Sequence, residues 1–356
     1  MYKFKIFNNL EGECDKVWRE FEKKSSHNFF QDFDYIKQLV NKENLENIVF
    51  IYYEEKIIMI LPLEIKKYFI FNVLQWIGTG VSDFCNPTIL KDEKFKIDDQ
   101  KFLQTWKKII SNIKGFDLIF LNNQPSIIEN TSNPFSKLSK ISYSKVYQII
   151  LPSNFDSYKM KIKKNNNKHY YEIHRTLIKQ SNLMKSSNLE FDINSSFKDK
   201  NDFKLIIKNK ITQLEDKEFK HNFDEKFVST FENLFNNENK KFVLFNLKVN
   251  SKVISSCLGI VYRNTFYYYL PMILSKEFNK YKPGKILLIK IIEWCIKNKI
   301  NTFDFGLGQE HYKKYFSNFS FNLYRYLSFV NLKGSVFYIF LKLYFYGKNF
   351  LNIKKS

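Results

Sequence analysis

Two short motifs carry the residue types best suited to chemistry, and the first is the run NKYKPGKILL. It places Gly284 after a proline and between Lys282 and Lys285, directly ahead of an apolar helical pattern. Helix N-termini bind phosphates through outward-pointing N–H groups, and neighbouring lysines add positive charge. The motif therefore predicts either a phosphate-binding turn or an ordinary helix start after a turn, and residue chemistry alone favours neither.

The second motif is the run FDFGLGQEHYKKYF, in which a strand ends at Asp304 and two glycines follow. Asp304 can orient or deprotonate an acceptor, Glu310 can act as a base, and Tyr312 can donate a proton. Lys313 can stabilise a phosphate or an oxyanion, and it is the preferred functional candidate. The structural alternatives are a carboxylate bound to backbone N–H groups for Asp304, a first-turn acid for Glu310 and simple packing for Tyr312.

The elements that must position these motifs follow a pattern that occurs twice. A strand, a turn, two more strands, a helix and a last strand are expected near residues 47–121 and again near residues 241–306. A single long helix is expected at about residues 155–185, between the two copies. A dinucleotide-binding site is excluded, because His311 stands where the third glycine of the fingerprint should be and no βαβ unit follows.

Composition sets the broad class. The chain has 356 residues, of which 44% are hydrophobic and 18% aromatic, so it can bury a large core. Its formal net charge is +21, which suggests a nucleic acid or an anionic membrane as partner. However, arginine contributes four of the 57 cationic residues, and the abundant Lys, Asn, Ile and Phe all have AT-rich codons. Coding bias is therefore the preferred explanation of the global charge.

The spacing of the cysteines and the sequences at the two ends of the chain indicate the cellular compartment in which we expect the protein. The four cysteines are scattered without a C-x-x-C pair, so neither a zinc ribbon nor a disulfide framework is expected, and no metal site is predicted. The first residues lack an apolar signal segment. The late apolar run at residues 335–347 is too short to span a bilayer and contains Lys342. We expect a cytoplasmic protein whose C-terminal apolar helix either packs on the second module or touches a membrane.

Taken together, the motifs resemble the CelD/BcsL-type acyltransferases, which are tandem-GNAT proteins related to the FemAB-like aminoacyltransferases. Order and spacing agree over nearly the whole chain. The resemblance is carried by four segments: NFFQDFDYIKQLV (residues 28–40), VLQWIGTGVSDFCNPTIL (residues 73–90), FNKYKPGKILL (residues 278–288) and FDFGLGQEHYKKYF (residues 303–316). The first turn of the third segment has one glycine where the family's CoA-binding loop usually has more.

The resemblance implies an α/β (α+β) fold of two tandem GNAT-like modules, each a mixed, mostly antiparallel sheet with flanking helices. The expected modules are residues 1–150 and residues 151–356, the second including the long basic helix and the C-terminal apolar helix. The implied reaction moves an acyl group from acyl-CoA, a co-substrate and not a bound cofactor, to an amine or hydroxyl. The acceptor would be a nucleotide-sugar, a glycan or another envelope or exopolysaccharide precursor.

The resemblance also assigns site residues. CoA would bind at Tyr281, Lys282, Gly284 and Lys285, and the catalytic candidates would be Asp304, Glu310, Tyr312 and Lys313. Acceptor binding would involve Ser82 and Asp83, at a cleft between the modules, and Lys168 and Arg175 of the basic helix. Ser82 and Asp83 could equally form a local turn.

Three questions stay open at this stage. Lys161, Lys164, Lys168, Arg175 and Lys179 form one cationic stripe that either guides an anionic ligand or is a solvated face. The donor could be aminoacyl-tRNA, as in FemAB-like enzymes, which would give that stripe a function. A non-catalytic binding protein on the same fold is the alternative outside enzymes, and the single glycine at the predicted CoA turn is the feature in its favour.

Overall fold

The computed structural model of the chain describes residues 1–41, 43–92, 96–139, 141–216, 218, 221–237 and 240–355, with the backbone alone at 240 and 346–355. The chain forms two compact units, residues 1–144 with 322–356, and residues 145–321. The sequence-based division placed everything after residue 150 in the second module. The structure differs because the last strand and helix return to the first unit.

The sheet of the first unit has the strand order β1-β3-β4-β5-β7-β16. Neighbouring strands are antiparallel, except that β5 and β7 run parallel. The strands are β1 (Lys3–Phe7), β3 (Leu45–Tyr53), β4 (Lys56–Tyr68), β5 (Phe71–Trp76), β7 (Leu118–Pro125) and β16 (Phe319–Phe329). Two short pairs lie beside them: β2 (Ser25–Ser26) with β6 (Thr88–Leu90), and β8 (Ile127–Ile128) with β9 (Thr131–Ser132).

The first meander follows the predicted pattern with one difference. Glu54 and Glu55 both have positive φ, as the predicted hairpin turn between β3 and β4 requires. The charged pair Lys66-Lys67 predicts a break between two strands there, but β4 runs on to Tyr68, and a loop of two residues leads into β5. The helices of this unit are α1 (Glu13–Glu22), η1 (Phe29–Gln31), α2 (Phe33–Leu39), α3 (Asp99–Asn112), α4 (Pro134–Leu138) and α11 (Leu332–Lys355).

The sheet of the second unit has the order β11-β12-β13-β14-β15-β10. Its pairing repeats that of the first unit, because all neighbours are antiparallel except β14 and β15. The strands are β10 (Ile141–Ile150), β11 (Leu189–Asn194), β12 (Lys240–Val249), β13 (Lys252–Tyr262), β14 (Thr265–Ile273) and β15 (Thr302–Asp304). This repetition confirms the predicted duplication of one strand and helix pattern.

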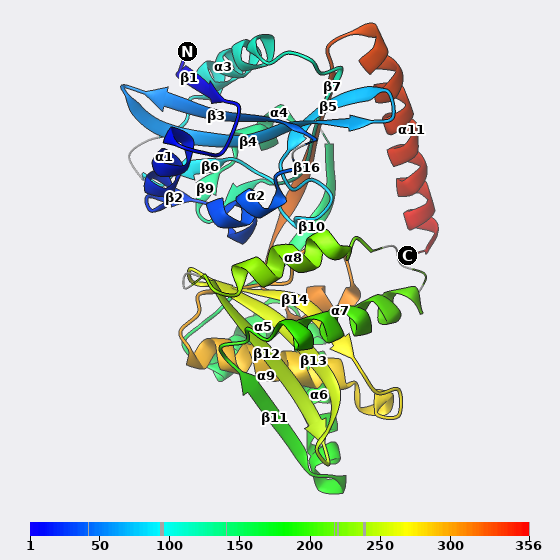
Figure 1. Ribbon diagram of the computed structural model, residues 1–356. Coiled ribbons are helices and arrows are strands. Elements are labelled where there is room, and N and C mark those ends of the chain that lie inside the picture. The colour runs from blue at the N-terminus through cyan, green and yellow to red at the C-terminus, as the bar shows by residue number, and fades with distance from the viewer. Residues whose placement is uncertain are drawn as a thin grey trace. The chain divides into compact units, whose positions relative to one another are not determined.

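The helices of the second unit cover both faces of its sheet. They are α5 (Phe155–Asn165), α6 (Asn167–Ser186), α7 (Lys200–Glu215), α8 (Glu225–Leu234), η2 (Asn279–Tyr281), α9 (Pro283–Lys297) and α10 (His311–Phe316) (Figure 1). Phe245 of β12 packs edge-on against Trp294 of α9, whereas Phe242 of the same strand contacts Phe231 of α8. Because side chains alternate along a strand, these contacts place α9 and α8 on opposite faces.

The predicted long helix at residues 155–185 is wrong as a single element. Asn166 has φ −166° and ψ 112°, so it ends α5, and its side chain accepts a hydrogen bond from the Lys168 backbone N–H to begin α6. An asparagine in extended conformation that caps the next helix breaks the helical ladder. The cationic stripe predicted on one helix is therefore divided between two.

Candidate functional site

β14 and β15 separate where the site begins. Their parallel pairing covers three residue pairs and ends at Tyr267 opposite Asp304. β14 continues to Ile273 and contains Pro271, a residue that strands tolerate at edges because it has no N–H to donate. The Pro271 carbonyl oxygen accepts a hydrogen bond of 2.7 Å from the Lys210 ammonium of α7. Up to Tyr267, β14 is hydrogen-bonded to β15. Beyond that residue its backbone is open to side chains such as Lys210.

The start of α9 lies beside this opened strand. Lys282 precedes the helix with φ 56° and makes no side-chain cap, and Pro283 has no N–H. The Lys285 N–H bonds to the Lys282 carbonyl oxygen at 2.9 Å. Among the described residues, the N–H of Gly284 has no partner. A Cβ on Gly284 would make an ordinary van der Waals contact with the Ile273 side chain of β14 at 3.4 Å, so the space at the turn does not require glycine. The Gly284 N–H is the helix-end donor that the turn leaves accessible.

A buried carboxylate organises the cations around this turn. Glu172 of α6 is 7% exposed and pairs with Arg175 at 2.7 Å, with Lys282 at 3.8 Å and with Lys285. Burial alone would raise the pKa of Glu172, but its three cationic partners, Lys285 foremost, hold the pKa below its usual value. Lys179 joins the group by donating to the Lys280 carbonyl oxygen at 2.8 Å. Glu172 thus fixes the lysines at the start of α9.

A cavity of about 350 Å³ connects the opened strand with the helix start. It lies within the second unit, and its walls combine cations, hydroxyl groups and one carboxylate. Its lining includes Lys210, Ser255, Tyr268, Lys282, Gly284, Lys285, Glu310 and Tyr312. Three lysines and one glutamate give the cavity a net positive charge, which suits a phosphate-bearing ligand.

Asp304 and Lys313 hold the glycine-rich loop of the second motif and lie outside the lining of this cavity. Asp304 is 2% exposed, and its carboxylate accepts hydrogen bonds from the Gly306 N–H at 2.7 Å and from Gln148 at 2.6 Å. Lys313 is 3% exposed and donates to the Leu307 carbonyl oxygen. For Asp304 the geometry matches the structural alternative, a carboxylate that closes the turn.

Glu310 and Tyr312 are the members of the second motif that reach the cavity. The Glu310 carboxylate is 2.9 Å from the Lys313 ammonium, and a Cβ on Gly308 would collide with that carboxylate. The Glu310 carboxylate thus lies over Gly308 and pairs with Lys313 at the cavity wall. Burial raises the pKa of Tyr312, so the phenol stays protonated at neutral pH. Among the described residues, its hydroxyl has no hydrogen-bond partner.

The other predicted site residues lie apart from this cavity. Tyr281 and Lys168 are not part of its lining, and Lys168 is exposed in the first turn of α6. Ser82 and Asp83 belong to the first unit. The Ser82 hydroxyl is 3.2 Å from the Tyr35 hydroxyl in a buried contact, so it takes part in local packing there. Asp83 is half-buried.

Sequence reasoning missed Lys210, Ser255, Tyr268 and Glu172. Lys210 lies in a lysine-rich helical region where nothing distinguishes it, and Ser255 and Tyr268 lie within runs that read as strands. Glu172 gave one signal, because it is an acid within the otherwise basic stripe of α6 and lies three residues before Arg175. Its other two cations, Lys282 and Lys285, come from a distant segment, which sequence spacing cannot bring to Glu172.

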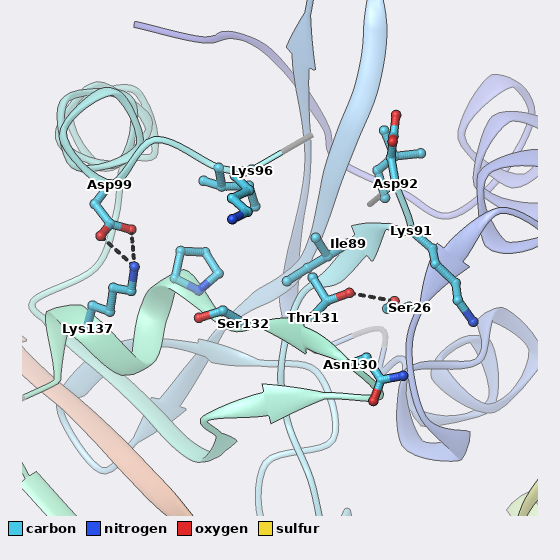
Figure 2. Close-up of a pocket in the computed structure, with 13 residues that line it drawn as sticks. Ser26, Ile89, Lys91, Asp92, Lys96, Asp99, Asn130, Thr131, Ser132 and Lys137 are labelled. Atoms are coloured by element: carbon cyan, nitrogen blue, oxygen red, sulfur yellow. Dashed lines mark hydrogen bonds and ion pairs between the residues drawn. The ribbon is translucent and has the colours of Figure 1, made fainter. Parts of the chain in front are cut away.

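The first unit has a different charge at the corresponding helix start. The α3 N-terminus is capped by the Asp98 side chain, which accepts from the Lys101 N–H at 2.8 Å, and Asp99 adds a second acid. A cavity of about 390 Å³ adjoins this start, where Asp99 pairs with Lys137 and Ser26 bonds to Thr131 (Figure 2). A capped acidic helix start disfavours anions, so the start of α9 suits an anionic ligand better than the start of α3 does.

Comparisons with known proteins give a family match within the second unit. Residues 175–314 match the family model described as an acetyltransferase (GNAT) domain. A search of the curated proteins found no match. Three solved structures share the fold at low sequence identity. They are FemX (12% identity, TM-score 0.53, covering 88% of this chain and 96% of its own), a tandem GNAT protein from the clavulanic acid biosynthesis pathway (5%, 0.50, 93% and 100%) and L-PGS from Bacillus licheniformis (10%, 0.50, 95% and 97%).

These findings confirm the predicted fold class, a mixed α/β tandem GNAT arrangement. Residues 175–314 match a GNAT acetyltransferase domain, which supports an acyltransferase of the GNAT superfamily. The cavity at the α9 start lies within the matched residues. In the described ranges, no group of three or more His, Cys, Asp or Glu residues could hold a metal ion.

Proposed function

We propose that the second unit transfers an acyl group from acyl-CoA to an amine or hydroxyl group. The observation that carries the proposal is the cavity where the Gly284 N–H, Lys282 and Lys285 meet the opened strand β14. GNAT domains generally use acyl-CoA as donor. The helix-end N–H and the two ammonium groups suit its pyrophosphate, and the opened strand edge suits an extended ligand such as its pantetheine arm.

Glu310 and Tyr312 are the proposed catalytic residues, because they line the same cavity. Glu310, whose carboxylate pairs with Lys313, would accept the acceptor's proton directly or through water. The amine or hydroxyl then bonds to the thioester carbon, the carbon–sulfur bond breaks, and the protonated phenol of Tyr312 would give its proton to the leaving thiolate. In this proposal Asp304 and Lys313 are positioning residues, because Asp304 holds the glycine-rich loop and Lys313 pairs with Glu310.

The acceptor is proposed on the sequence resemblance to the CelD/BcsL-type enzymes. It would be a nucleotide-sugar, a glycan or another envelope or exopolysaccharide precursor, handled in the cytoplasm. Asp83 and Ser82 are retained as proposed acceptor ligands on the same basis, although the Ser82 hydroxyl already contacts Tyr35. Arg175 and Lys168 would add positive charge for a phosphate-bearing acceptor. Arg175 is also part of the Glu172 cluster beside the cavity.

A second candidate donor is aminoacyl-tRNA. Two observations favour it: the α9 start offers one N–H where a CoA-binding loop usually offers several, and α5 presents exposed Lys161, Lys163 and Lys164 around a shallow hollow. RNA backbones bind such lysine surfaces through phosphate contacts that weaken as salt rises. On this alternative the cavity would hold the aminoacyl end of the RNA.

Thermal unfolding with acetyl-CoA, CoA and tRNA, together with thiol release from acetyl-CoA, tests the proposal. We expect acetyl-CoA and CoA to raise Tm, and Tyr312→Phe to keep that shift but release thiol more slowly. Tyr315→Phe is the matched control, because Tyr315 lies on the same helix outside the cavity lining. Stabilisation by tRNA alone, lost at high salt, would establish the second donor. Without stabilisation by any of the three, the chain would be a binding protein for another ligand.

A further inference from the structure

The helix α11 of the first unit has one face packed against the sheet. Phe337 stacks on Phe71 of β5 with ring centroids 4.6 Å apart, and Phe345 lies 5.9 Å from Phe120 of β7. A Cβ on Gly334 would overlap the Asp117 carbonyl oxygen, so the first turn rests directly on the chain before β7. Figure 1 shows the helix beside β5 and β7. These contacts fix which face of α11 points outward.

The opposite face of α11 is an exposed apolar ridge. Its members recur every three or four residues and are each more than half exposed: Leu332, Val336, Ile339, Phe340 and Leu343. A helix that is apolar on both faces is usual inside a core, where neighbours cover both. Here the described structure covers one face, and a contiguous exposed ridge of this kind marks a surface that binds something apolar.

The hairpin loop between β4 and β5 extends this apolar surface. Phe69 and Ile70 are its two loop residues, 92% and 65% exposed, and Phe69 has φ 54°. Loops of two residues normally use glycine or asparagine at positive φ, because a bulky side chain is strained there. The adjoining Phe71 stacks on α11, so the loop stands next to the helix. The chain thus exposes two large apolar side chains where local turn chemistry disfavours them.

The charges around this surface are positive. Lys342 and Lys333 flank the ridge on its two sides, at about 80° and 100° around the helix from Leu332. Lys66 and Lys67 lie next to the hairpin loop, and residues 66–71 and 332–345 contain no Asp or Glu. Lys333 pairs with Asp117 at 3.0 Å, which leaves a net positive rim. Two copies of such a surface would repel each other, whereas an anionic lipid surface would attract it.

We propose that the α11 ridge and the Phe69–Ile70 loop dock on a bilayer that contains anionic lipid. The helix lies along the interface with its apolar ridge toward the acyl chains, and the flanking lysines contact lipid phosphates. No helix of the described chain is long and apolar enough to cross a bilayer. This inference is independent of the donor proposed for the second unit.

Co-sedimentation with vesicles tests the docking. We expect the full chain to bind vesicles of 70% phosphatidylcholine and 30% phosphatidylglycerol, and to bind less as salt rises. Phe69→Asp and Leu343→Asp should each lower the partition coefficient about tenfold or more, because each removes a large apolar side chain from the contact. Both positions are exposed, so far-ultraviolet circular dichroism and Tm should match the wild type.

Leu205→Asp is the matched control, because Leu205 is 56% exposed on α7 in the other unit and should bind vesicles as the wild type does. Equal loss in Leu205→Asp would show non-specific adsorption and overturn the proposal. The proposal also fails if the wild type ignores anionic vesicles at low salt. Dimerisation in the absence of lipid that Leu343→Asp abolishes would assign the ridge to a second copy of the chain instead.

Discussion

Lys285 gives the sharpest test of the phosphate-binding turn. Its ammonium lines the cavity beside the Gly284 N–H and pairs with Glu172. A hydrogen bond to a charged group contributes about 1.5–3 kcal/mol. Because Lys285 also pairs with Glu172, we assign about 1.5–2 kcal/mol, the lower part of this range, to its hydrogen bond with the CoA pyrophosphate. Lys285→Met should therefore weaken CoA binding roughly 10- to 30-fold.

The same substitution should also cost stability, for a separate reason. Removing one partner of a fully buried ion pair costs about 3–5 kcal/mol. Glu172 keeps Arg175 at 2.7 Å and Lys282 at 3.8 Å, so we expect the free energy of unfolding to fall by about 1–2 kcal/mol. The double variant Glu172→Gln with Lys285→Met also removes the buried carboxylate that has lost one of its three cations. It should regain most of the stability but none of the CoA affinity.

Calorimetric titration and urea unfolding separate these two effects. CoA and pantetheine, which lacks the pyrophosphate, are titrated into the wild type, Lys285→Met and the double variant. We expect Lys285→Met to weaken CoA binding and to leave pantetheine binding unchanged. Equal CoA affinity in the wild type and Lys285→Met would refute the phosphate role. A matching loss for pantetheine would show that the substitution distorts the cavity rather than removing a phosphate ligand.

Three further predictions concern single side chains. Tyr312→Phe should lower kcat about 100-fold with little change in KM for the donor. Because burial raises the pKa of Tyr312, the pH–rate profile of the wild type should show no loss of activity from ionisation of this phenol between about pH 6 and 9. Lys313→Met should lower the free energy of unfolding by about 2 kcal/mol in urea, since the part-buried Leu307 carbonyl oxygen and Glu310 lose their cation. Burial would raise the pKa of Glu172, but its cations, chiefly Lys285, lower it. The carboxylate therefore stabilises the fold fully above about pH 5, and this stabilisation is lost as the pH falls through the folded-state pKa. The stability of Glu172→Gln should accordingly depend less on pH below about 5 than that of the wild type, as acid unfolding would measure.

The repeated strand pattern could be predicted because its signals are local. Paired positive-φ residues at Glu54–Glu55 and Asn250–Ser251 join strands of β-branched and aromatic residues, and each signal lies within a few positions. The return of β16 and α11 to the first unit could not be predicted. It depends on the pairing of β16 with β7, about 200 residues earlier in the chain, which no local pattern encodes.

Residues that line the cavity could be proposed from the sequence where one segment supplies several of them. Gly284 and its lysines, and Glu310 with Tyr312, were found because they lie within two short runs, and the cavity brings the two runs together. Lys313 attracted attention as a charged residue in a motif, yet its ammonium is directed to the Leu307 carbonyl oxygen. Sequence shows that a lysine is present but not whether its charge faces a ligand or a buried backbone atom.

Duplication also explains why one site is expected rather than two. Both units place a helix after a three-stranded meander and begin a parallel strand after it, so each has a helix start available for an anion. In α3 the Asp98 carboxylate already occupies a first-turn N–H, whereas at α9 Pro283 removes one donor and Gly284 leaves the next one accessible. Loss of phosphate binding needs one acidic cap, so a duplicated fold can keep both sheets while one helix start becomes structural. The first unit is then released from donor binding, and its surface, including α11, can serve other contacts.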